Sequence, residues 1–389
     1  MLTGSEANDN KRSALRLQGR SVRREKRLWH DPKQPIESLG CHNCLDREIC
    51  GGLRPAKPIF DCITAFCCGD PEGCGLVCPK SRGFAKRIQE VDALEIDNIP
   101  KSPACSVGPI ADFAPLIYHN SSREEAFDAD LVAVPLGMMV DRKTDRPRFN
   151  DPHDLRKKFG IGQRARLLLS GTDKDPVIER LWGLEREGRR ALARNLRDLG
   201  VAMVTTPNFS LFTNRPRWDD LHSVKRIAIT YHEFASEGVP TALHVNGRTE
   251  HDFARWSKFI QDHAEVTHIA YEFTTGTGWV GRRKQHAAWL IELANDVGRP
   301  LGLVVRGGAE MLVELREAYA NVTFIDTSVF LKTIKRQRAV PAGNTHLKWV
   351  PAPTLRGQPL DRLMEDNFDT VRAWISASEP ALVRSVPAG

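Results

Sequence analysis

The sequence LGLVVRGGAEMLVELREAYANVTFIDT (301–327) contains the pattern from which the fold class can be inferred. It begins with an apolar run at 301–307, continues through a segment of helical character at Ala309–Ala320, and ends in a second apolar run at 322–327. Apolar runs without polar alternation are typical of parallel strands that are buried on both faces. The stretch therefore predicts a strand, a crossover helix and a second strand parallel to the first.

Similar units recur along most of the chain. Runs rich in Val, Ile and Leu stand at 130–137, 165–171, 201–206, 241–246, 268–273, 301–307, 322–327 and 347–352. Besides Ala309–Ala320, helices are predicted at Pro176–Leu199, Trp218–Gly238, Asp252–Ile260, Gln285–Asn295 and Asp361–Ile375. Eight repeats predict a (β/α)8 TIM-like barrel at 116–389, and an open doubly wound sheet is the alternative.

Within Trp218–Gly238 the run RIAITY has the composition of a strand. Its apolar residues fall at helical spacing together with those on either side, so we expect a helix. These residues are Leu221, Val224, Ile227, Ala228, Tyr231, Phe234 and Ala235.

The segment at 31–115 predicts a separate, cysteine-rich module. It holds all nine cysteines, and eight of them lie between residues 41 and 78: Cys41, Cys44, Cys50, Cys62, Cys67, Cys68, Cys74 and Cys78. Clustered thiols in a cytoplasmic protein are more often metal ligands than disulfides. The C-x2-C-x5-C start and the C-x3-C-P end favour an iron–sulfur cluster, such as [4Fe–4S], over zinc. Buried free thiols or disulfides are the remaining alternative, and we expect the isolated Cys105 to be a small core residue.

The first three cysteines of this block resemble the C-x2-C-x5-C stretch of SPASM-type auxiliary iron–sulfur modules in radical enzymes. That resemblance covers about a dozen residues. The C-x3-C-x2-C triad that binds the radical-generating cluster is missing, because no third cysteine follows Cys74 and Cys78 at the required spacing. Radical chemistry is therefore not implied.

The N-terminal 30 residues predict a basic, disordered arm. Eight Lys or Arg and one Glu lie between Lys11 and Arg27, which gives 8 − 1 = +7, the net charge of the whole chain. Such an arm can lie along DNA or RNA and release counterions, or it can serve only as a solubilising tail. The first thirty residues have no apolar signal segment, and the longest apolar run, at 131–140, is too short to span a bilayer, so we expect a cytoplasmic protein.

Polar residues follow the predicted strands where the active site of a barrel lies. Three acids are the catalytic candidates, namely Asp173, Glu272 and Asp326. The candidates for binding substrate or phosphate are Asn208, Asn246, Arg282, Arg283, Arg306, Gly307 and Gly308. Carboxylates in a shared cavity can act as base or nucleophile, and arginine can hold a phosphate with two hydrogen bonds. The competing interpretation is that these residues cap helices, form structural ion pairs or are ordinary surface charges.

The motif TTPNFSLF (205–212) resembles a family of bacterial and phage proteins that is classified only as a domain of unknown function, whose motif reads T-P-D-F-S-L-Y. The resemblance covers about residues 200–275. Asn208 replaces the acid of that motif, and the family has no assigned activity that the resemblance would imply here.

Three functions remain open on the sequence alone. The first is an iron–sulfur or zinc barrel enzyme that acts on nucleic acid or nucleotides. The second is a non-catalytic subunit that binds nucleic acid or forms a larger complex, in which the metal is structural. The third is a small-molecule redox or lyase enzyme, which leaves the basic arm unexplained. Fold alone does not choose among them.

Overall fold

The computed structural model describes residues 87, 89–211, 217–248, 250–274, 280–342 and 346–377. The basic arm and the eight clustered cysteines lie outside these residues. The described parts of Met1–Glu95, Ser210–Lys225 and Gly247–Asp252 belong to a smaller compact unit, and the rest belong to a larger one. In the smaller unit, the buried Arg248 pairs with the buried Asp220, and Nε2 of His222 lies 3.1 Å from Oε2 of Glu90.

The larger unit is built around eight parallel strands. Strands β2 to β8 pair in chain order, each with the next, and β1 pairs with β8. Their bounds are β1 Phe113–Pro115, β2 Leu131–Pro135, β3 Arg166–Ser170, β4 Met203–Thr205, β5 Thr241–His244, β6 His268–Glu272, β7 Gly302–Arg306 and β8 Asn321–Asp326. The two ends of the sheet meet at a bridge between Leu116 and Ala133, and the N–H of Ile117 donates to the carbonyl of Ala133 at 2.9 Å. This closure confirms the predicted barrel architecture and excludes the open doubly wound sheet.

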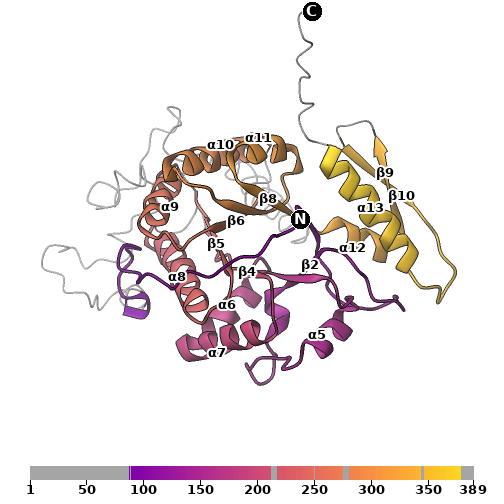
Figure 1. The fold of residues 1–389 in the computed structure, drawn as a ribbon, viewed down its shortest axis with the longest axis horizontal. Helices are drawn as coiled ribbons and strands as arrows, with labels where there is room; N and C mark the ends of the chain where they lie inside the picture. Colours follow the sequence, from indigo (N-terminus) through magenta and orange to yellow (C-terminus); the bar gives the residue numbers. More distant parts are fainter. Residues whose placement is uncertain are drawn as a thin grey trace, which may run out of the picture. The chain divides into compact units, whose positions relative to one another are not determined.

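Helices connect the strands and lie outside them (Figure 1). They are α5 Pro152–Phe159, α6 Asp175–Gly183, α7 Glu185–Asp198, α8 Arg217–Ser236, α9 Glu250–Asp262, α10 Val280–Val297, α11 Leu312–Ala318, α12 Ser328–Ile334 and α13 Asp361–Ala377, with 3-10 turns η2 Leu136–Met139 and η3 Ala309–Met311. The run RIAITY lies inside α8, and all seven residues of its predicted apolar stripe are buried. The helical assignment of this run is confirmed.

The predicted eighth strand is wrong. All but the last residue of 347–352 fall in β10 (His346–Pro351). This strand pairs antiparallel with β9 (Gln337–Ala342) in a separate two-stranded sheet that packs against α13. Lys348 and Val350 are exposed on this strand, whereas Leu347 and Trp349 are half-buried, so the strand has one solvated face. That pattern is typical of an antiparallel sheet, and the barrel position belongs instead to the three-residue β1.

The structure divides one predicted helix into two. The segment Pro176–Leu199 breaks at Leu184 between α6 and α7. Glu185 has φ of 56°, in the left-handed region, which does not continue a right-handed helix. Gly200, with φ of 67°, follows α7 as expected for a helix end.

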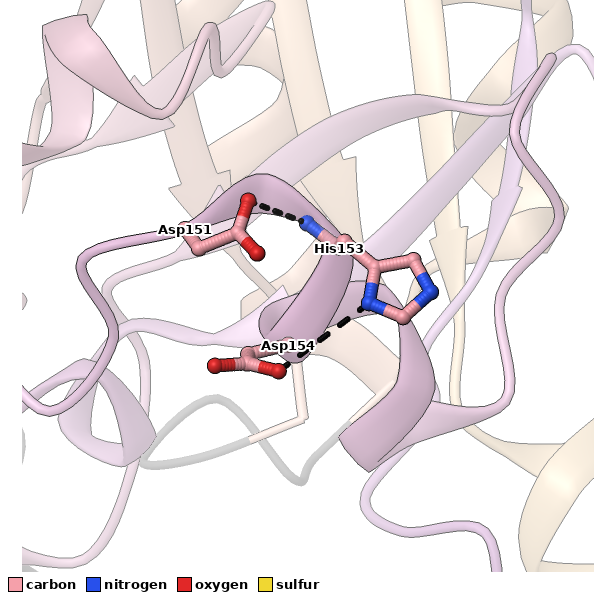
Figure 2. A group of neighbouring side chains, drawn as sticks. All are labelled: Asp151, His153 and Asp154. Carbon is pink, nitrogen blue, oxygen red and sulfur yellow. Dashed lines mark hydrogen bonds and ion pairs between the residues drawn. The ribbon is translucent and has the colours of Figure 1, made fainter.

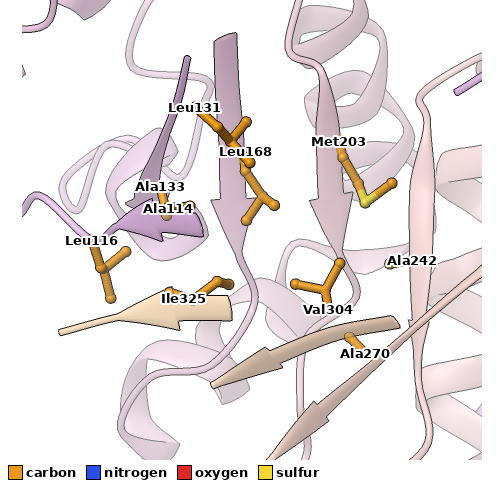
Figure 3. Packing of buried hydrophobic residues seen from close by; sticks show 10 residues of the cluster. All are labelled: Ala114, Leu116, Leu131, Ala133, Leu168, Met203, Ala242, Ala270, Val304 and Ile325. Atoms are coloured by element: carbon orange, nitrogen blue, oxygen red, sulfur yellow. The ribbon is translucent and has the colours of Figure 1, made fainter. Parts of the chain in front are cut away.

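The barrel interior is filled by side chains from all eight strands (Figure 3). They are Ala114, Leu116, Leu131, Ala133, Leu168, Met203, Ala242, Ala270, Val304 and Ile325. Each is at most 3% exposed, and alanines interleave with larger residues so that the layers interdigitate. This apolar plug is the floor below the carboxyl ends of the strands.

Candidate functional site

A polar layer lies above the apolar plug. Side chains two residues apart on a strand share a face, so the residues two steps beyond the plug also face the interior. They include Tyr118, Ser170, Thr205, His244, Glu272 and Arg306. The barrel therefore changes from apolar to polar at its carboxyl end, where barrel enzymes hold their active sites.

Glu272 and Arg306 are paired residues of neighbouring strands at this end. Oε2 of Glu272 lies 3.4 Å from Nε of Arg306, and the Glu272 side chain is only 2% exposed. The other oxygen, Oε1, accepts a 2.7 Å hydrogen bond from the N–H of Thr274 and one from the Thr274 hydroxyl. Burial raises the pKa of Glu272 above its ordinary value, while Arg306 and Thr274 act in the opposite direction.

Arg306 makes one hydrogen bond in addition to its ion pair with Glu272. Its Nη1 donates to the carbonyl oxygen of Thr172 at 2.9 Å, and its side chain is 17% exposed. Neither Nε nor Nη2 makes a hydrogen bond to any residue that the structure describes. The guanidinium is therefore positioned, yet it keeps donors for an anion.

Asp173 and Tyr118 belong to the same electrostatic environment. Burial raises the pKa of Tyr118, the charge of Arg306 lowers it, and the charges of Asp173 and Glu272 raise it. The half-buried Asp173 also accepts a 2.7 Å hydrogen bond from the N–H of Lys174. Two of the three predicted acids, Asp173 and Glu272, thus lie near Arg306 at the barrel mouth.

Asp326, unlike Glu272, stabilises the start of a helix. Its oxygens accept hydrogen bonds from the N–H of Val329 at 2.6 Å and from the hydroxyl of Ser328 at 2.8 and 3.0 Å, so it caps the first turn of α12. Burial raises its pKa, and these hydrogen bonds lower it. Because its neighbour Ile325 faces the plug, Asp326 points to the opposite face of β8.

The two predicted asparagines bind each other. Nδ2 of Asn246 donates to Oδ1 of Asn208 at 2.7 Å and to the carbonyl of Phe209 at 2.9 Å, while the indole N–H of Trp256 donates to the carbonyl of Asn246 at 2.9 Å. These bonds connect the loops that follow β4 and β5. They give both side chains a structural role at the rim.

The remaining predicted phosphate ligands also have local explanations. Arg283 pairs with Glu310 at 2.6 Å. Burial raises the pKa of Tyr271, and the charge of the nearby Arg282 opposes this shift. Gly307 and Gly308 have φ of 74° and 71°, and a Cβ on them would lie 2.4 Å from the methyl of Thr274 and 2.7 Å from the ring of Phe273, respectively. Glycine is required there by backbone conformation and close packing.

His244 and Tyr118 are site residues that the sequence did not reveal. His244 is 2% exposed, and neither ring nitrogen has a hydrogen-bond partner among the described residues. Burial lowers the pKa of His244 to about 3; the backbone of Thr206 acts in the opposite direction, and the charge of Arg306 lowers the pKa further, so the ring is neutral at physiological pH. The only signal in the sequence is a histidine two residues after an interior alanine in TALHVN.

Cys105 is half-buried rather than a core residue. Its thiol donates to the carbonyl of Ala235 at 3.4 Å, and burial raises its pKa.

A further group of potential metal ligands, Asp151, His153 and Asp154, lies on the surface at the start of α5 (Figure 2). Oδ1 of Asp151 accepts a hydrogen bond from the N–H of His153 at 3.1 Å, which is a helix cap. All three residues are exposed, and capping accounts for their proximity.

Among the described helices, none has the length and apolar character needed to cross a membrane.

No protein-family model matches the chain, and no curated protein matches it. Two crystal structures of an N-terminally His-tagged D-allulose 3-epimerase from Methylomonas sp. are similar to it at 12% sequence identity. One, in complex with D-allulose, has a TM-score of 0.35 over 69% of this chain and 99% of the epimerase chain. The other, with additional C-terminal residues, has a TM-score of 0.33 over 71% and 100%. At this level of similarity the comparison carries no information on substrate or reaction.

Proposed function

We propose that the barrel is an enzyme that acts on a phosphate-bearing substrate at the carboxyl ends of its strands, with nucleotides or nucleic acid as the expected class. The observation that carries the proposal is the buried Glu272 beside an arginine with uncommitted donors. A carboxylate and a guanidinium inside a barrel mouth combine a proton acceptor with an anion ligand.

The two side chains have distinct roles in this proposal. Arg306 is fixed through Thr172 and through its ion pair with Glu272, and it offers Nη2 to phosphate oxygens. Glu272 is fixed through Thr274 at Oε1, and we assign proton exchange with substrate to Oε2, which lies 3.4 Å from Nε of Arg306. Because its pKa is raised, Glu272 is closer to the range in which a carboxylate works as a general acid or base.

The cysteine block and the basic arm complete the proposal. We expect the eight cysteines at 41–78 to bind an iron–sulfur cluster, or else zinc, and the arm at 11–27 to add affinity for DNA or RNA. Both expectations rest on residue type and spacing, since these segments lie outside the described residues.

A binding experiment tests the anion site first. Isothermal titration with AMP and with inorganic phosphate should show binding that is lost in Arg306→Ala. Arg338→Ala is the matched control, because Arg338 is a surface arginine paired with Asp366 at 3.4 Å on the β9–β10 sheet. Single-turnover assays on DNA, RNA and nucleotides, with and without reductant and divalent metal, then test for a reaction.

A second candidate is a non-catalytic subunit that binds nucleic acid or another protein. The structural roles of Asp326, Asn208 and Asn246 favour it, because three predicted site residues stabilise loops and helices. Binding that depends on the arm but not on Arg306, without turnover in any assay, would select this function.

A further inference from the structure

We infer that the reaction at this site moves a proton at a carbon next to a carbonyl group, with Glu272 as the base and His244 as the hydrogen-bond donor to the carbonyl oxygen. This inference rests on the phosphate-binding part of the proposed function and replaces its expected class, nucleotides or nucleic acid, by organic phosphates that carry a ketone or aldehyde. Intact nucleic acid does not meet that condition.

The unpartnered ring of His244 is the first argument. Four histidines are buried among the described residues, and the other three all interact through a ring nitrogen. Nδ1 of His286 bonds the Tyr271 hydroxyl, Nδ1 of His263 lies 2.9 Å from Glu265, and Nε2 of His222 lies 3.1 Å from Glu90. A buried polar group without a partner is costly, which marks His244 as a group held ready for a ligand.

The position of His244 is the second argument. It lies on β5 and Arg306 lies on β7, while Glu272 lies on the strand between them. His244 is in register with Ala270, two residues before Glu272, and Glu272 is in register with Arg306. All three side chains face the interior, so a small molecule whose phosphate binds Arg306 has its next carbons beside Glu272 and His244.

The charge state of His244 is the third argument. Its neutral imidazole has one N–H to donate, and the N–H of its own backbone is already committed to the Thr206 hydroxyl oxygen at 2.8 Å. A neutral donor stabilises the negative charge that develops on a carbonyl oxygen. Because it carries no charge itself, it does not compete with Arg306 for the phosphate. It also leaves Glu272 without a second cation that would lower its basicity.

The proposed step balances without a cofactor. Oε2 of Glu272 takes the proton, and the electron pair of the broken C–H bond forms a C=C bond to the carbonyl carbon. The π pair of the carbonyl moves to its oxygen, which accepts the hydrogen bond from His244. Reversal returns a proton from Glu272 to carbon. In D2O the proton on Glu272 exchanges with solvent, so deuterium enters the substrate next to the carbonyl.

Proton NMR in D2O tests this step directly on the full-length protein. The probes are dihydroxyacetone phosphate and ribulose 5-phosphate, and glycerol 3-phosphate is the matched compound without a carbonyl. We expect the wild type to exchange the hydrogens next to the carbonyl, above the rate of an enzyme-free blank, and we expect Glu272→Gln to abolish exchange. His244→Phe should lower exchange at least about 100-fold while glycerol 3-phosphate still binds, and His244→Gln should retain part of the rate.

A measurement on the wild type covers the case in which the His244 variants do not fold. Dihydroxyacetone phosphate should shift the 15N resonances of the His244 ring, whereas glycerol 3-phosphate should leave them nearly unchanged. Binding of phosphates through Arg306 without exchange, or with an unshifted His244 ring, overturns this inference and leaves the proposed function intact. Absence of any binding that depends on Arg306 overturns both.

Discussion

Glu272 and Asp326 each end a barrel strand, but their carboxylates serve different neighbours. Glu272 faces the interior beside Arg306, with its Oε2 lacking a hydrogen-bond partner among the described residues. Asp326 faces the opposite side of its strand and binds the first turn of α12. The first arrangement is suited to exchange with a ligand, whereas the second is suited to stabilising a helix.

Amide substitution separates these two roles. Glu272→Gln should lower turnover by about 10²–10⁴ and leave the free energy of unfolding nearly unchanged, because the removed group acts as an acid or base. The matched variant Asp326→Asn keeps a capping oxygen and should stay active. Turnover and chemical denaturation of both variants check this. A Glu272→Gln variant that stays active and loses about 3–5 kcal/mol of stability would show that the pair with Arg306 is structural.

His244 should make the fold sensitive to acid. Its pKa is about 3 in the folded protein and about 6.5 in an unfolded chain, so below pH 6.5 the unfolded state binds more protons. The neutral ring therefore contributes to stability above pH 6.5, and this contribution is lost progressively as pH falls toward 3. Urea midpoints measured across this range should fall less steeply for His244→Phe than for the wild type. Parallel curves would contradict the lowered pKa.

At the residue scale, the sequence identified Glu272 and Arg306 because a charged residue that ends an apolar run is conspicuous. It did not separate Asp326 from them, since which face a strand residue occupies depends on register. His244 was missed for a related reason. One histidine inside an apolar run has the appearance of a core residue until the interior face of β5 is known.

At the scale of elements, strands that are buried on both faces were predictable and short ones were not. Seven of the eight barrel strands coincide with continuous apolar runs. The strand β1 has only three residues, including Pro115, and offers no periodic signal. The strand β10 was assigned to the barrel because its composition is apolar, although its exposed Lys348 and Val350 indicate a half-solvated sheet.

A buried ion pair connects helices α7 and α8. The guanidinium of Arg189 donates to both oxygens of Glu233 at 2.6 and 2.8 Å and lies 4.0 Å from the ring of Trp182. The side chains of Arg189 and Glu233 are 6% and 3% exposed. Removal of one partner would therefore leave the other as an unpaired buried charge.

Glu233→Ala should accordingly lower the free energy of unfolding by about 3–5 kcal/mol. The control is Glu187→Ala, since Glu187 is an exposed residue that pairs with Arg194 on the surface, and no measurable change is expected there. Denaturant unfolding of both variants provides the comparison. Equal stabilities would show that the buried pair contributes no more than the exposed one.

At the scale of the whole molecule, the cysteine block predicts a metal centre in addition to the barrel. Protein purified without oxygen should be brown and absorb broadly near 400 nm, roughly where iron–sulfur clusters do, and should contain iron and sulfide. Substituting Cys41 and Cys44 by Ser should remove the colour, with Cys105→Ser as the unaffected control. Colourless protein with stoichiometric zinc would contradict the assignment of iron, but it would agree with a metal site at these cysteines.

The basic arm should control how binding to nucleic acid depends on salt. Deleting residues 1–27 should weaken binding to DNA or RNA and flatten the slope of log affinity against log salt concentration, since several phosphate contacts are lost. Fluorescence anisotropy at several salt concentrations measures both quantities. Identical curves for the truncated and full-length proteins would identify the arm as a solubilising tail.

A crystal structure with glycerol 3-phosphate tests whether the polar layer of the barrel is the active site. We expect the phosphate about 3 Å from Nη2 of Arg306, with the carbon chain extending toward Glu272 and His244. A phosphate bound elsewhere, with the Glu272–Arg306 pair unchanged, would contradict it.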